Sequence, residues 1–327
     1  MALACASAIG SATPRVADGY RIDVVATGLH RPIQLALDPT GRLVVLSHGR
    51  RDDVAGELLW LDVSAGAPID GSGSPRVVIQ FPEGPRKVIF GSLTVDERSG
   101  DVYLGEENGN RVYRFTADKR LEAVAVGIQH LVGGSSIVLD RQGRLVILDF
   151  ASPETNLRSE ARVPSGLDAF AGEGYQGPLV FRLDLRNMTM LPRRLDFISP
   201  VFPRQSTRPT LAPPRRFISV GLSVEDDMVL LDSLGQLTRL SRGEVTEFVR
   251  LPAGHYHRTN MALGPDGAVW VSSGFHVREL FRISPAGAVS IVADQLADPQ
   301  GLVIDAEGRI YLVETALHRI VRIRAGR

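Results

Sequence analysis

Residues 296–323 read LADPQGLVIDAEGRIYLVETALHRIVRI, and the pattern of this stretch recurs along the chain. Two short apolar runs, 302–304 and 310–313, flank the turn Asp-Ala-Glu-Gly at 305–308, and a third run follows at 319–323. Apolar runs this short, bounded by Gly and Asp, are typical of strands rather than helices. The stretch therefore predicts a three-stranded antiparallel meander, which cannot bury both of its faces without further copies of itself.

The chain supplies six such copies. Their strand–turn–strand segments read LALDPTGRLVVLS (35–47), LTVDERSGDVYLGE (93–106), IVLDRQGRLVILD (137–149), LSVEDDMVLLD (222–232), MALGPDGAVWVSS (261–273) and LVIDAEGRIYLVE (302–314). Another strand follows each copy, and a fourth precedes the hairpin in segments such as RIDVVATGL. Four strands per unit at a nearly regular period predict an all-β, six-bladed β-propeller with four-stranded antiparallel blades.

The two ends of the chain fit a closed ring. Strand 21–26 has no unit of its own before it, and the last copy ends after its third strand at 320–324. Pairing these two strands would close the ring and remove an exposed sheet edge. We therefore expect a single propeller domain over residues 20–327, preceded by a leader or disordered segment at 1–19.

The third strands of the copies share one further feature. Arginine recurs in register as Arg114, Arg239, Arg282 and Arg322, and the aligned residues in the other two copies are Trp60 and Phe181. These side chains are expected to pack between blades, with the arginine stems buried and their heads solvated.

Composition excludes several classes of partner. Thirty-seven basic residues balance 37 acidic ones, so the chain has no electrostatic footprint for nucleic acid or an anionic membrane. No apolar run approaches the ~20 residues that a membrane span needs. Cys5, the single cysteine, lies in the leader MALACASAIGSATP, so neither a disulfide framework nor a cysteine-based zinc site can form.

The leader leaves two interpretations open. Ala6-Ser7-Ala8 suits a signal-peptidase site, although no positively charged segment precedes it. A truncated export signal and a disordered terminus both fit. We expect an exported monomer, periplasmic or extracellular.

The repeats resemble those of the NHL-repeat and gluconolactonase (senescence marker protein) superfamily of six-bladed propellers. The shared pattern P-x-G-[LI]-x-[VI]-D-x-x-G-x-[IL]-[YW]-[VL] is clearest at Pro299–Leu312, and the repeat resemblance spans residues 20–326. Gluconolactonase-like enzymes hold a divalent cation with Glu, Asn and Asp at the starts of first strands. Ile33 and Gln300 stand where that Glu and Asp are expected, so the resemblance implies that a calcium site of this type is not assembled.

Propeller lyases of the same kind place histidine directly after the proline of P-H-x-[IL]. In this chain Ile33 and Gln300 follow that proline, Thr259 stands at the aligned step of the fifth copy, and His30 and His257 come earlier, on loops. A zinc site could still form from loop histidines, because zinc accepts three His with an open water position. His30, His130 and His257 are the candidate metal ligands.

One rim collects the residues suited to chemistry. Strand parity places on one face all seven histidines (His30, His48, His130, His255, His257, His276 and His318) and also two long insertions, 150–178 and 197–216. Histidine is suited to proton transfer near neutral pH. His257 and His130 are the catalytic candidates, with Glu106 as carboxylate partner; a solvated or loop-pinning role is the alternative for each. The candidate substrate-binding residues are His30, Gln34, Asn260, Gln300 and Arg258.

These observations predict an enzyme that acts on a small polar or carboxylated molecule in a pocket over the central channel. Hydrolysis of an ester or lactone is the first hypothesis, and a histidine- or metal-assisted lyase or isomerase is the second. A non-catalytic module that binds a peptide, glycan or protein is the third. Convergence of the rim histidines would favour an enzyme, and their dispersion without a shared cavity would favour the binding module.

Overall fold

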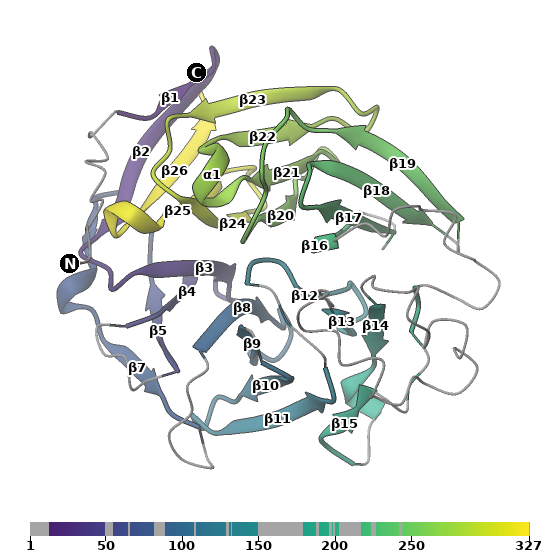
Figure 1. Ribbon diagram of the computed structural model, residues 1–327. Helices are drawn as coiled ribbons and strands as arrows, with labels where there is room; N and C mark the ends of the chain where they lie inside the picture. Colours follow the sequence, from purple (N-terminus) through teal and green to yellow (C-terminus); the bar gives the residue numbers. More distant parts are fainter. Residues whose placement is uncertain are drawn as a thin grey trace, which may run out of the picture.

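A computed structural model describes residues 13–49, 55–64, 66–81, 89–107, 109–128, 131, 133–149, 179–187, 190–195, 198, 200–202, 217–223, 227–241 and 244–326. His130, most of the predicted leader and nearly all of both predicted insertions lie outside these residues. Six antiparallel sheets stand around a common centre (Figure 1). The predicted all-β, six-bladed propeller is confirmed.

Each sheet is one blade, built outward from the centre. Blade one contains β3 (Pro32–Leu37), β4 (Leu43–Ser47), β5 (Gly56–Leu61) and β7 (Arg76–Ile79). Blade two contains β8 (Ile89–Val95), β9 (Val102–Glu107), β10 (Arg111–Phe115) and β11 (Leu121–Val126). Blade three contains β12 (Ile137–Leu139), β13 (Leu145–Asp149) and β14 (Leu179–Leu183).

Blade four contains β16 (Phe217–Leu222), β17 (Met228–Asp232), β18 (Gln236–Ser241) and β19 (Glu244–Arg250). Blade five contains β20 (Asn260–Leu263), β21 (Val269–Ser272), the short helix α1 (Gly274–Val277), β22 (Leu280–Ile283) and β23 (Val289–Asp294). Blade six contains β24 (Pro299–Ile304), β25 (Ile310–Glu314), β26 (Arg319–Ala325) and the N-terminal strand β2 (Tyr20–Thr27).

The ring closes as the sequence predicts. Strand β2 pairs antiparallel with β26, from Tyr20 opposite Ala325 to Ala26 opposite Ile320. Three two-residue strands, β1 (Arg15–Val16), β6 (Ile69–Asp70) and β15 (Arg193–Arg194), extend blades five, six and two. The pairing with β2 covers the outer edge of β26, which protects that strand against the addition of another strand.

The hairpin turns explain why the motif D-x-x-G-R recurs. Asp38 Oδ1 accepts hydrogen bonds from the backbone N–H groups of Thr40 and Arg42, and its Oδ2 accepts one from Arg42 Nε at 2.8 Å. The intervening Gly41 has φ +80°, which only glycine adopts without strain. The same bonds recur in the turns Asp140–Arg144 and Asp305–Arg309.

The arginine repeat needs one correction. Arg114 lies opposite Tyr103 and Arg322 opposite Tyr311, and the residue in the same register of blade three is Arg182, opposite Val146. Phe181, which the sequence alignment assigned to this position, is one residue out of register and is buried between blades two and three. Arginine therefore occupies the position in five blades, and blade one alone carries tryptophan there.

Candidate functional site

Antiparallel pairing places the start of each first strand and the end of each second strand on one face. Pro32 pairs with Ser47, and Asn260 pairs with Ser272. Within the described part of the chain, this face therefore carries His30, His48, His255, His257, His276 and His318. The one-sided distribution of these six histidines agrees with the sequence prediction.

A segment of blade three crosses the middle of this face. Gly134 N donates to Gly91 O of blade two at 3.0 Å, and Ser135 N donates to Thr259 O of blade five at 3.1 Å. The Ser135 hydroxyl also donates to Asn260 Oδ1 at 3.1 Å, while Val220 N of blade four donates to Ser135 O. This crossing joins four blades at the middle of the ring, where the sequence predicted a central channel.

Buried polar side chains tie the innermost strands to one another. Gln34 Nε2 donates to Gly91 O at 3.1 Å, and Ser272 Oγ donates to Gln300 O at 2.5 Å. The Ser92 and Ser136 hydroxyls share a hydrogen bond of 2.5 Å. Gln34, a predicted substrate-binding residue, thus uses its amide nitrogen to join blade one to blade two.

Arg258 stands directly beside the crossing. Its Nε and Nη2 both donate to Glu107 Oε1 of blade two, at 2.9 and 2.5 Å. Space for the Glu107 side chain depends on Gly91, where an added Cβ would lie 2.7 Å from Glu107 Cβ. Arg258 Nη1 makes no hydrogen bond within the described residues. The guanidinium is therefore anchored at one edge and has one donor group available.

His48 is a buried neutral imidazole near this cation. The residue is 8% exposed, and burial, followed by the charges of Arg258 and Arg31, lowers its pKa to about 4. Arg31 Nη2 lies 3.2 Å from His48 Nδ1. Because a guanidinium can only donate, Nδ1 is the acceptor and the ring proton resides on Nε2. That Nε2 is buried and has no hydrogen-bond partner in the described structure.

Three imidazoles gather on blade five. The His255 and His257 rings stack at a centroid distance of 6.4 Å, and His255 meets His276 edge-on at 5.1 Å. His257 is solvent-exposed on the rim, yet the protein atoms packed around it lower its pKa. Arg258 contributes next, and His255 and His276 act in the same direction, whereas Glu107 opposes them. His257 is thus biased toward its neutral form.

Asp298 supplies a carboxylate to the same neighbourhood. Its Oδ2 accepts a 2.8 Å hydrogen bond from Gln300 Nε2, and its Oδ1 is buried without a partner among the described residues. Burial raises the pKa of Asp298, while its hydrogen bond with Gln300 and the charges of Arg258 and His276 act in the opposite direction. Arg258 therefore acts electrostatically on His48, His257 and Asp298, and this set with Glu107 is the Arg258 group.

Glu106 and His30 make other contacts. Glu106 is fully buried, and its Oε2 accepts from Asn110 N at 3.2 Å. Glu314 at the equivalent strand end similarly accepts from Ala297 N, as expected for a loop-pinning acid. His30 Nδ1 lies 2.9 Å from Glu57 Oε2, and Arg76 contacts both residues. This triad is separate from the contacts of Arg258.

Among the predicted substrate-binding residues, Asn260 is the one with a buried polar atom that has no partner in the described structure. Its Oδ1 accepts from Ser135, whereas its Nδ2 is buried without a partner in the described part of the chain. The sequence did not single out His48, Glu107 or Asp298. Glu107 was visible only as the neighbour of Glu106, and alternation along β9 sends the two side chains to opposite faces.

The described residues do not assemble a ligand set for a histidine-based zinc site or for a gluconolactonase-type calcium site. No cluster of three or more His, Cys, Asp or Glu residues suited to a metal ion occurs among the described residues. Ile33 is 2% exposed in the apolar core between blades one and two, and the Gln300 amide is engaged by Asp298. These two positions do not offer the carboxylates of a gluconolactonase-type calcium site. His130 lies outside the described residues, so the set His30, His130 and His257 stays a prediction.

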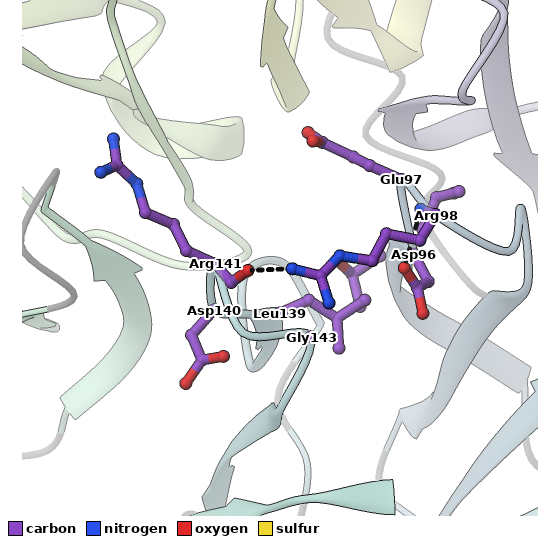
Figure 2. A pocket seen from close by; sticks show the side chains of 9 residues that line it. Asp96, Glu97, Arg98, Leu139, Asp140, Arg141 and Gly143 are labelled. Atoms are coloured by element: carbon purple, nitrogen blue, oxygen red, sulfur yellow. Dashed lines mark hydrogen bonds between the residues drawn. The ribbon is translucent and has the colours of Figure 1, made fainter. Parts of the chain in front are cut away.

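A groove of about 340 Å³ lies on the opposite face, at the hairpins of blades two and three. Figure 2 shows Arg98 reaching across it to donate to the Arg141 carbonyl at 3.2 Å. Asp96, Glu97 and Asp140 line it together with these arginines. Its charges are mixed, and it is remote from the histidine face because each hairpin lies at the other end of its strands.

No protein-family model and no curated protein matches the chain. Its fold is similar to that of a calcium structure of a Trichoderma reesei protein of carbohydrate-active enzyme family AA12, with a TM-score of 0.65, 12% identity, and coverage of 96% of this chain and 97% of that one. Virginiamycin B lyase from Staphylococcus aureus matches with a TM-score of 0.58, 13% identity, and coverage of 94% and 100%.

A structural-genomics target provisionally named a gluconolactonase matches with a TM-score of 0.55, 15% identity, and coverage of 95% and 94%. At these identities the similarity shows the fold alone. The resemblance inferred from the repeats is confirmed at the level of a six-bladed propeller architecture that includes enzymes. Among the described helices, none is long and apolar enough to cross a membrane.

Proposed function

We propose that the chain is an enzyme that hydrolyses an ester or lactone of a small, polar, carboxylated molecule above the blade-three crossing. One observation carries this proposal: the Arg258 cation, fixed by Glu107, lies among imidazoles whose pKa values it helps to lower. A neutral base beside a fixed cation is the pairing that acyl transfer requires, because one accepts a proton while the other stabilises the developing oxyanion.

The proposed step uses two residues of the Arg258 group. Neutral His257 accepts a proton from a water molecule as the water oxygen bonds to the carbonyl carbon. Arg258 Nη1, the donor without a hydrogen bond in the described residues, stabilises the negative charge on the carbonyl oxygen. The carbon–oxygen ester bond then breaks, and the proton on His257 passes to the leaving alkoxide. A lactone would yield the open hydroxy acid.

Four buried side-chain atoms on this face have no partner in the described structure and support a polar substrate. His48 Nε2 and Asn260 Nδ2 are donors, Asp298 Oδ1 is an acceptor, and the Ser47 hydroxyl can act as either. Leaving buried polar groups unpaired costs roughly 1–3 kcal/mol each, so a ligand that pairs with them gains affinity. Two donors and a cation favour a substrate rich in oxygen and carrying a carboxylate, and Asp298 suits a substrate hydroxyl.

A lyase is the second candidate. Virginiamycin B lyase has the same fold, and a further structure holds a catalytically inactive histidine-to-alanine variant of that lyase with quinupristin. His257 and Arg258 would equally suit abstraction of a proton from carbon with stabilisation of the resulting enolate. Elimination gives an unsaturated product and incorporates no water oxygen, so the two reactions are distinguishable by their products.

The test is a panel of esters, lactones and uronides assayed in ¹⁸O-labelled water. Hydrolysis places one ¹⁸O in the acid product. Elimination places none, and its unsaturated product absorbs ultraviolet light. His257→Ala and Arg258→Ala are each expected to lower kcat/KM at least about 100-fold. The control is His318→Asn, on the same face but outside the Arg258 group. Saturable binding without turnover, or activity unchanged in both variants, would overturn the proposal.

A further inference from the structure

Blade one departs at its outer edge from the other blades whose fourth strand the structure describes. In blades two, four, five and six the register arginine of the third strand lies opposite a fourth-strand residue, namely Glu122, Thr246, Ser290 or Asp23. In blade one the fourth strand β7 begins at Arg76, opposite Leu59, so Trp60 has no partner across that edge. The fourth strand thus leaves this register position unpaired in blade one, the only blade with a tryptophan at that position.

The shortened strand leaves a groove of about 480 Å³ between blades one and two. Trp60 and Phe115 form its apolar surface, with Val77 on one side and the turn 116–119 on the other. The groove reaches Arg42 of the blade-one hairpin, so it opens toward the hairpin face, away from the histidines. Its volume is in the range of sites for small molecules.

The charges along this groove have one sign. Arg42, Arg76 and Lys119 line it, and no Asp or Glu is among its described lining residues. The Arg76 guanidinium is directed at the His30–Glu57 pair and Arg42 is paired with Asp38, so neither is a fully available cation. The Lys119 side chain is exposed and makes no hydrogen bond or ion pair with any described residue. The groove between blades two and three, by contrast, contains three acids.

We propose that this groove is a second binding site, for a small carboxylate attached to a ring. The ring would stack on the half-buried face of Trp60, and the carboxylate would point to Lys119. Tryptophan offers a rigid apolar surface that suits an aromatic or sugar ring, and a lysine side chain without an ion pair among the described residues suits an anion. The site is on the other face from the Arg258 group, so the proposal stands independently of the proposed reaction.

Intrinsic fluorescence tests the proposal, because the chain has two tryptophans and Trp270 is 5% exposed beneath Arg282. In a Trp270→Phe background Trp60 is the single reporter. Titration compares benzoate and glucuronate with their uncharged counterparts, benzyl alcohol and glucose. Saturable quenching by a carboxylate, with a Kd at least tenfold lower than that of its neutral counterpart, is expected. The more effective carboxylate identifies an aromatic or a sugar ligand.

Two variants locate the site. Lys119→Asn removes the charge but suits the left-handed turn conformation (φ +62°), and should weaken carboxylate binding about fivefold. Arg98→Asn, in the groove between blades two and three, is the matched control and should leave carboxylate binding unchanged. Trp60→Arg restores the repeat and should abolish binding measured by calorimetry, with the melting temperature as a check on folding. No saturable quenching, or equal effects of Lys119→Asn and Arg98→Asn, would overturn the proposal.

Discussion

Arg258 Nε donates a 2.9 Å hydrogen bond to Glu107 Oε1, joining two residues that are 151 positions apart in the sequence. One comes from blade five and the other from blade two, which face each other across the six-membered ring. Arg258 has φ +53°, an uncommon conformation for a non-glycine residue and one that can mark a functional site. The cation is therefore held over the middle of the face that carries the histidines.

Glu107→Gln tests this link. The glutamine keeps the shape and one acceptor but removes the charge, so Arg258 is held less firmly. Because Glu107 is the neighbour that raises the pKa of His257, removing its charge also lowers that pKa further. We expect kcat/KM to fall about tenfold and the acid limb of the pH–rate profile to move to lower pH. Glu244→Gln, at an exposed position of β19, is the control and should change neither quantity.

The pH dependence of catalysis follows from the state of His257. As a general base it must be neutral, and its pKa is lowered from 6.5. We expect kcat/KM to rise with pH through an apparent pKa below 6.5 and to remain level above it. A profile whose acid limb has a midpoint at or above 6.5 would contradict the assignment of His257 as the base.

His48 predicts a pH dependence of stability. Its folded-state pKa of about 4 lies below the unfolded value of 6.5, so between these values the unfolded state binds more protons. The contribution is fully present above pH 6.5 and is lost as the pH falls toward 4. At about 1.4 kcal/mol per pH unit, the difference between the two pKa values contributes roughly 3 kcal/mol to the free energy of unfolding. Urea unfolding at pH 7 and at pH 4.5 measures this contribution. In His48→Gln the free energy of unfolding should differ less between the two pH values.

Gly134 makes the blade-three crossing possible. An added Cβ would lie 2.3 Å from Thr259 O, and the residue has φ +96°. Gly134→Ala should therefore lower the free energy of unfolding by roughly 3 kcal/mol, through crowding as well as backbone strain. Gly41→Ala is the matched control, because Gly41 has φ +80° with nothing within 4 Å of the added Cβ and should show the strain alone. Equal losses in the two variants would show that the crossing is not tightly packed.

The ring was predictable because its determinants are local. The Asp38 and Asp305 carboxylates each bond to their own turn, so these hairpins are specified by a few adjacent residues. The pairing of β2 with β26 was predictable because strand 21–26 has no repeat unit of its own and the last copy ends after its third strand. The misassigned Phe181 had a different cause: residues 150–178 separate β13 from β14, and the register across them depends on pairing that no local pattern records.

The site was predictable only in outline. Strand parity placed the described histidines on one face, and the sequence singled out Arg258 and Asn260, which lie beside the blade-three crossing. Their roles in substrate binding stay a prediction. His48 was not among the chosen candidates because its lowered pKa depends on neighbours distant in sequence, including the charge of Arg258, 210 positions away. The Glu107–Arg258 pair lies beside the crossing, where Ser135 N of blade three donates to Thr259 O of blade five, and the repeat pattern does not contain this contact.

The most direct test is an NMR titration of the His257 ring in the wild-type protein and in Arg258→Ala. We predict a His257 pKa below 6.5 that rises when the neighbouring guanidinium is removed. A wild-type value at or above 6.5, or a value that does not change in Arg258→Ala, would contradict the claim that Arg258 keeps this imidazole neutral.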